Sequence, residues 1–122
     1  MSRKIRLNLR LTFPAGVPLA HGKAELMEHI RETGSIRQAA MKMDMSYRRA
    51  WLLCDELNHL FDETVIETNK GGKSGGGAQL SEFGEELLAR FRDMEKRTAE
   101  ALAADLDWLE RHARPQPETG EG

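Results

Sequence analysis

The sequence predicts a mainly α-helical fold with a small β component, and three patterns along the chain support this prediction. Apolar residues recur at helical spacing in three short segments and one long segment, whereas near the amino end they alternate with polar residues as in a strand. A glycine-rich run lies between two further strand-like pieces. With 122 residues, of which 39% are hydrophobic and 31% charged, the chain has the size of one globular domain with an appended helix or tail.

A strand and a helix are expected in the first third of the chain. From Ile5 to Phe13 every second residue is apolar, which is typical of a strand with one buried face. Pro14 and Pro18 end this pattern. Helical spacing then runs from Lys23 to Glu32, and Gly34 supplies a stop because glycine readily adopts the left-handed conformation of a helix cap.

Two capped helices separated by a tight turn follow. Ser35 can cap a helix that runs from Ile36 to Met43. Asp44 interrupts the helical pattern and fits a turn, because aspartate enters the left-handed region more readily than most residues. Ser46 can cap the next helix, which runs from Tyr47 to about Leu60. This arrangement is typical of a helix-turn-helix.

A glycine-rich hairpin is expected next. The segments Val65–Thr68 and Ala78–Leu80 have strand character and flank the run Gly71–Gly77. A nucleotide phosphate loop would need glycine, four residues and then Gly-Lys-Ser/Thr, but position 67 is Glu67, and such a loop lies between a strand and a helix. We therefore interpret the hairpin as the mobile wing of a winged helix-turn-helix, whose lysines and backbone amides would contact phosphate or the minor groove.

A long helix is expected to begin after Ser81 and to continue to about His112. Its apolar residues exceed what a body of about 80 residues needs to cover, so we expect this helix to build a dimer interface. The expected organisation is a winged helix-turn-helix DNA-binding domain over residues 1–80, a long dimerisation helix continuous with it over residues 81–113, and a tail over residues 114–122. This tail has no apolar anchor and is predicted to be disordered.

The second helix of a helix-turn-helix enters the major groove with its amino-terminal side chains on base edges. Arg48 and Arg49 lie in its first turn and suit guanine or phosphate, because a guanidinium can donate two hydrogen bonds at once. Leu52 fits a thymine methyl group, Tyr47 fits a phosphate or the core edge, and for Trp51 we favour core packing. The alternative is that these are ordinary solvated side chains. The expected DNA-binding residues are Ser35, Arg37, Ser46, Tyr47, Arg48, Arg49, Leu52, Asn69, Lys70, Lys73 and Ser74.

The formal net charge of −2 conceals an uneven distribution. Residues 1–80 contain 12 basic and 9 acidic residues, a net charge of +3, whereas residues 81–122 contain 6 basic and 11 acidic residues, a net charge of −5. A basic first part permits contact with nucleic acid without requiring it.

Neither an enzyme nor a metal protein is expected. The four histidines lack metal-site spacing, no serine or cysteine lies in a nucleophile motif, and acid pairs such as Asp55–Glu56 are adjacent rather than on one helix face. The single cysteine, Cys54, excludes an internal disulfide and fits a small core residue. No run of eighteen apolar residues occurs. We therefore expect a cytoplasmic protein with no cofactor and no membrane contact.

Three segments resemble a known family. They are Glu32-Thr-Gly-Ser-Ile-Arg-Gln-Ala-Ala, Met45-Ser-Tyr-Arg-Arg-Ala-Trp and Gly71-Gly-Lys-Ser-Gly-Gly-Gly-Ala-Gln-Leu-Ser. Together they resemble the N-terminal domain of the ModE molybdate-responsive regulators of bacteria and, more widely, the DNA-binding domains of LysR-type regulators. The resemblance covers about residues 5–100.

The resemblance implies a homodimeric transcriptional regulator that binds a palindromic operator of molybdenum-related genes, with residues 46–60 reading bases and residues 69–77 as the wing. Two features depart from the family. Full-length members bind molybdate or tungstate in carboxyl-terminal β domains, whereas this sequence ends at Gly122, so no oxyanion site is expected. Asp44 also stands where relatives often have glycine. An alternative is a dimeric module of this fold that acts through a separate effector-binding partner protein.

Overall fold

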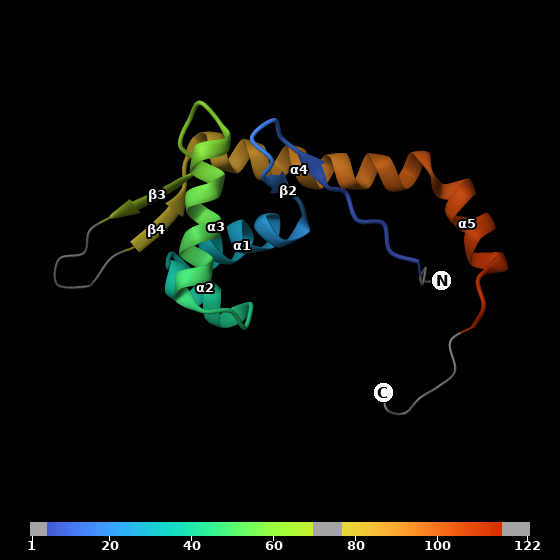
Figure 1. Ribbon diagram of the computed structural model, residues 1–122, viewed down its shortest axis with the longest axis horizontal. Coiled ribbons are helices and arrows are strands. Elements are labelled where there is room, and N and C mark those ends of the chain that lie inside the picture. The colour runs from blue at the N-terminus through green and yellow to red at the C-terminus, as the bar shows by residue number, and fades with distance from the viewer. Residues whose placement is uncertain (1–4, 70–76, 116–122) are drawn as a thin grey trace.

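The computed structural model describes residues 5–69 and 77–115, and shows a helical body with a hairpin at one end and a long helix that leads to the other end (Figure 1). Within these residues the helices are α1 His21–Thr33, α2 Ile36–Lys42, α3 Tyr47–Leu60, α4 Glu82–Ala101 and α5 Ala103–His112. Two antiparallel hairpins are formed by β1 Leu11–Thr12 with β2 Pro18–Leu19 and by β3 Ile66–Asn69 with β4 Gly77–Leu80. The predicted fold class, mainly α with a small β component in winged helix-turn-helix order, is confirmed.

The helix-turn-helix packs around the apolar faces that helical spacing predicts. Its buried side chains come from α1, α2 and α3, and include Leu26, Met27, Ile30, Ala39, Ala40, Ala50, Cys54 and Leu57. The two alanines of α2 are small enough for α1 and α3 to approach it closely. Each large buried side chain contributes about 1.5–3 kcal/mol relative to an exposed one.

The ends of these helices follow the predicted capping residues. Gly34 has φ 70° and its backbone N–H donates to the carbonyl of Ile30, which ends α1. The hydroxyls of Ser35 and Ser46 each accept a 3.0 Å hydrogen bond, from the backbone N–H of Gln38 and Arg49 respectively. Asp44 has φ 55°, so aspartate does adopt the left-handed conformation in the turn.

The amino-terminal segment is less regular than predicted. Side chains from Ile5 to Phe13 do alternate between partly buried and exposed, but only Leu11–Thr12 joins a strand pair. Pro18, expected to lie beyond the strand, forms part of β2 and lies opposite Thr12. The pair is this short because Phe13 begins a tight turn, in which its carbonyl accepts a hydrogen bond from Gly16. Phe13 itself packs edge-on against Phe61.

The hairpin β3–β4 is attached to the helices by hydrogen bonds at its base. The Asn58 carboxamide oxygen accepts from the backbone N–H groups of Val65 and Ile66, at 2.8 and 2.9 Å, and its amide donates to the carbonyl of Ile66. On the other strand, Ala78 donates 2.9 Å to the carbonyl of Gly34 at the end of α1. Gly77, predicted to belong to the glycine loop, instead pairs with Asn69 as part of β4.

The long carboxyl-terminal helix begins where predicted but is interrupted. Ser81 caps α4 by accepting from Gly84 at 2.9 Å. The helix breaks at Leu102 (φ −101°, ψ 12°), and α5 leaves in a new direction (Figure 1), so one continuous helix to His112 is wrong. One turn earlier the Thr98 hydroxyl donates 2.6 Å to the carbonyl of Met94, a bond that tends to bend helices. Of the predicted disordered tail, residues 116–122 lie outside the described residues.

Candidate nucleic-acid interface

The outward face of α3 is where sequence analysis expected base contacts. Ala50 and Leu57 of this helix point into the core, whereas Arg48 and Arg49 in its first turn are exposed. Leu52 is 48% exposed. In Figure 1, α3 lies across the other helices of the body beside the hairpin β3–β4. The helix-turn-helix thus presents two arginines and a leucine on one accessible surface.

The positive charges of α2 and α3 have no carboxylate partner within residues 5–69 and 77–115. They are Arg37, Lys42, Arg48 and Arg49, and all four side chains are exposed. By contrast, five cations of α1 and α4 form ion pairs at 2.7–3.0 Å: Lys23, Arg31, Arg90, Arg92 and Arg97. Four exposed cations without carboxylate partners, carried by two helices that pack together, are typical of a surface that binds an external polyanion.

Arg37 and Tyr47 are in contact across the two helices. The guanidinium carbon of Arg37, on α2, lies 4.4 Å from the centre of the Tyr47 ring, at the start of α3. This distance is within the range of a cation–π interaction. Both residues were predicted to bind DNA, and the structure brings them together at the amino-terminal ends of α2 and α3.

The surface is more apolar than predicted. Trp51 is 47% exposed and is not among the side chains that pack against the core, so the favoured interpretation of a packing residue is wrong. Met41 at the end of α2 is 73% exposed and was not singled out from the sequence. Exposed apolar residues beside cations suit a ligand with both phosphate and apolar groups.

The predicted wing residues are only partly described. Asn69 is exposed at the end of β3, whereas Lys70, Lys73 and Ser74 lie outside the described residues. The serines Ser35 and Ser46 serve as helix caps, and both are at least partly accessible.

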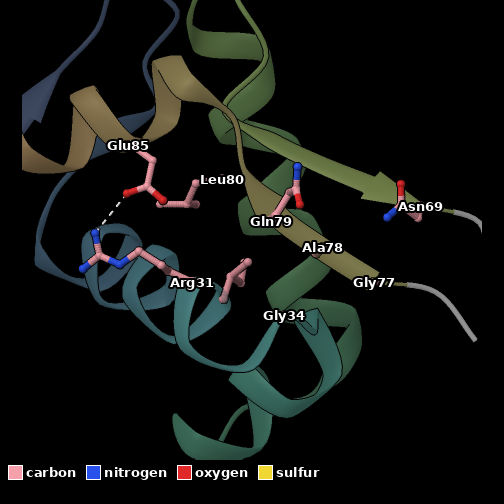
Figure 2. Close-up of a pocket in the computed structure, with 9 residues that line it drawn as sticks. Arg31, Gly34, Asn69, Gly77, Ala78, Gln79, Leu80 and Glu85 are labelled. Carbon is pink, nitrogen blue, oxygen red and sulfur yellow. Dashed lines mark hydrogen bonds and ion pairs between the residues drawn. The ribbon is translucent and has the colours of Figure 1, made fainter. Parts of the chain in front are cut away.

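A shallow hollow of about 510 Å³ lies at the base of the hairpin, between the end of α1, β4 and the start of α4 (Figure 2). Arg31 and Glu85 form a 3.0 Å ion pair along its wall. Because Arg31 and Glu85 neutralise each other and are the charged residues of the described lining, that lining has no net charge to attract an anionic ligand. Two of the lining residues, Ala78 and Gly34, form the hydrogen bond that attaches the hairpin to the end of α1.

The described residues provide little for catalysis. Burial raises the pKa of the Cys54 thiol to about 12, which keeps it protonated and unreactive at neutral pH. Among residues 5–69 and 77–115, no cluster of three histidine, cysteine or acidic side chains could hold a metal ion. Nor does any helix of this part have the length and apolar character needed to cross a membrane.

Two supporting contacts were not predicted from the sequence. Asn58 attaches β3 to α3, and Arg37 stacks on Tyr47. The available signal for Asn58 was a polar residue on the flank of an apolar helix face, four positions after Cys54. For Arg37 no local pattern identifies the ring it contacts, because the two residues lie on different helices.

Comparison with known proteins agrees with the geometry, although no family model matches the chain. It is 40% identical over 84 residues to the "Molybdenum transport protein ModE" of Herbaspirillum seropedicae, which is 69% of this chain and 31% of that protein. It is 37% identical over 89 residues to the "Molybdenum-pterin-binding protein MopA" of Rhodobacter capsulatus, 72% of this chain and 34% of the relative.

A third relative is named for its activity. The "DNA-binding transcriptional dual regulator ModE" of Escherichia coli (strain K12) is 39% identical over 69 residues, 57% of this chain and 26% of the relative. The chain thus spans about a third or less of the length of these relatives. Fold and similarity together show that the chain carries a winged helix-turn-helix domain of the ModE regulator type.

Proposed function

We propose that the protein binds specific double-stranded DNA as a homodimer and regulates transcription of molybdenum-related genes. The observation that carries the proposal is the surface of α2 and α3, where four exposed cations have no described carboxylate partner beside half-exposed Leu52 and Trp51. The printed name of one relative includes DNA binding and transcriptional regulation, and the names of others include molybdenum.

In this proposal α3 is the recognition helix and lies in the major groove. Arg48 and Arg49 donate to guanine O6 and N7 or to phosphate, while Leu52 contacts an apolar base edge. The caps Ser35 and Ser46 and the flanking Arg37 contact the DNA backbone at the margin of this helix, where Tyr47 also lies.

The hairpin β3–β4 acts as the wing. Asn69, Lys70, Lys73 and Ser74 contact phosphates or the minor groove beside the recognition helix. The hydrogen bonds that Asn58 and the carbonyl of Gly34 accept from the two strands support this role, because they attach both sides of the hairpin base to the helix-turn-helix.

The carboxyl-terminal helices build the dimer. On α5, Trp108 is 53% exposed and Leu109 is also exposed, beyond the break at Leu102. The helix has Asp105 in its first turn and Arg111 in its last turn. An antiparallel two-fold pair would cover the apolar side chains and place Asp105 near the partner's Arg111, so a second copy is complementary in both respects.

Binding-site selection on random duplex DNA tests the proposal, with sequencing after selection at two salt concentrations. A palindrome with half-sites about 34 Å apart is expected, with weaker binding at higher salt because neutralised phosphates release counterions. Failure of a folded dimer to enrich any sequence at low salt would contradict DNA recognition by this chain alone and favour a module that needs a partner protein.

Light scattering tests the dimer separately. Trp108→Asp is expected to yield monomers because it places a charge in the covered α5 face. Met41→Asp is the matched control, since Met41 is also an exposed apolar residue but lies on α2. A Trp108→Asp protein that stays dimeric would show that α5 is not the interface.

A further inference from the structure

The Arg37–Tyr47 contact gives the margin of the proposed recognition surface a defined geometry. Arg37 is the second residue of α2 and Tyr47 the first residue of α3, and the Arg37 guanidinium carbon lies 4.4 Å from the Tyr47 ring centre. Both side chains remain exposed to solvent. The contact therefore fixes an arginine at the surface instead of burying it.

The Tyr47 ring covers only part of the Arg37 guanidinium. Arginine has five N–H donors spread around this group, so those on the side away from the ring can still donate. Within the described part of the chain, those of Arg37 have no acceptor, whereas Arg92 uses its N–H groups on two carboxylates. Arg37 thus has N–H groups available for a ligand, on a side chain that the Tyr47 ring holds in place.

We propose that Arg37 and Tyr47 form a phosphate clamp, in which Arg37 donates hydrogen bonds to a DNA backbone phosphate and Tyr47 is the positioning residue. This inference rests on the proposed DNA binding. A phosphate is the expected acceptor because the first helix of a helix-turn-helix crosses the DNA backbone, while the face of the second helix meets the bases. Tyr47 stands at the very start of α3, at the edge of the face that contains Arg48 and Leu52.

The Tyr47 ring improves binding because it reduces the conformational entropy that the Arg37 side chain loses when it contacts DNA. Immobilising a long flexible side chain at an interface costs conformational entropy, and a side chain already held against a ring loses less. Tyr47 thus contributes to affinity through Arg37, without needing a DNA contact of its own.

Affinity measured as a function of salt tests the clamp, with the full chain on two duplexes: a selected operator and a scrambled sequence of equal length. Arg37→Ala should reduce the slope of log K against log salt by about 0.9 per protomer on both duplexes. If the electrostatic contribution vanishes near 1 M, this corresponds to about an eightfold loss per protomer at about 0.1 M salt. Lys96→Ala, which removes an exposed cation of α4, should change neither quantity.

Variants of the ring test positioning. Tyr47→Phe keeps the ring and should bind like the parent, whereas Tyr47→Ala should lose about two- to fivefold per protomer. Tyr47→Ala should cause no further loss when Arg37→Ala is already present. Arg37→Lys keeps the charge and should retain most of the salt slope with reduced affinity, because an ammonium group does not stack as a plane.

Several outcomes would overturn the clamp. A loss confined to the operator duplex would make Arg37 a base reader. Equal losses from Tyr47→Ala with and without Arg37 would mean that the ring contacts DNA directly. An unchanged salt slope in Arg37→Ala, with Arg48→Ala still impaired, would remove the clamp and leave the proposed function intact, whereas absence of binding by the parent protein would overturn both.

Discussion

The α1–α4 contact and the surface of α2 and α3 both contain arginines, but use them in opposite ways. Between α1 and α4, Arg92 donates to both oxygens of Glu28, at 2.9 and 2.8 Å, and to Glu95 at 2.7 Å. On α2 and α3, Arg48 and Arg49 have no carboxylate partner among the described residues. The first region uses charge to fix one element against another, and the second leaves charge available for a ligand.

The difference predicts that the two regions respond to different measurements. Substitutions between α1, the hairpin and α4 should change the free energy of unfolding, because they remove contacts within the chain. We call the exposed surface of α2 and α3, with Arg37, Arg48, Arg49 and Leu52, the open face. Substitutions there should change DNA affinity and leave the free energy of unfolding nearly unaltered, since exposed side chains without partners contribute within about 0.5 kcal/mol to stability.

The largest effect is expected where α4 approaches the loop before β3. A Cβ added at Gly84 would lie 2.4 Å from the carbonyl oxygen of Val65, which is backbone and has little room to move. Gly84→Ala should therefore destabilise the protein by about 3 kcal/mol, measured by urea unfolding. The matched control is Gly22→Ala in α1, where a Cβ meets nothing within 4 Å. This change should stabilise by about 0.5–1 kcal/mol, and similar losses from both substitutions would contradict the close-approach argument.

The open face should show the reverse behaviour. Arg48→Ala or Arg49→Ala should weaken operator binding by about 1–3 kcal/mol if the arginine makes a bidentate base contact, and should leave the unfolding midpoint almost unchanged. Fluorescence anisotropy gives the affinity, and Lys96→Ala on α4 serves as the exposed-cation control. If neither arginine affects binding while Lys96 does, the DNA surface has been placed on the wrong helices.

The Arg92 network should give a smaller, pH-dependent effect on stability. Arg92→Met leaves Glu28 without its main partner and should cost about 1–2 kcal/mol at pH 7. Hydrogen bonding from Arg92 holds the pKa of Glu28 below the usual range of a glutamate. A depressed carboxyl pKa contributes stability above the unfolded-state pKa, and that contribution is lost as pH falls through the folded-state value. The difference between parent and Arg92→Met should thus shrink below about pH 4, and a difference independent of pH would contradict the ion-pair account.

Local sequence predicted those parts of the fold that local chemistry determines. Gly34, Ser35 and Ser46 act within one helical turn, so the helix ends and the turn between α2 and α3 follow from the residues there. The break at Leu102 was missed because no proline or glycine marks it. The exposure of Trp51 was also missed, because it depends on which neighbours cover that side of α3.

In the candidate site, too, the features set within one helix were predicted and the contacts between helices were not. Helical spacing placed Arg48 and Leu52 on the outward face, since that face is opposite a run of core residues. The stacking of Arg37 on Tyr47 depends on the angle between two helices, which no pattern within either helix specifies. The pairing of cations on α1 and α4 was likewise not visible, because Glu28 and Arg92 are 64 positions apart.

The smallest expected effect tests the apolar part of the open face. In the major groove the thymine methyl is the apolar group a base edge offers, so exposed Leu52 can gain hydrophobic contact chiefly there. Replacing the contacted thymine by uracil removes one methyl group and should cost about 0.8 kcal/mol, close to fourfold in affinity. Leu52→Ala should cost a similar amount on thymine DNA and make the protein insensitive to the uracil exchange. If uracil weakens both proteins equally at every thymine of the operator, Leu52 does not read the methyl group, and the apolar residues of this face have another partner.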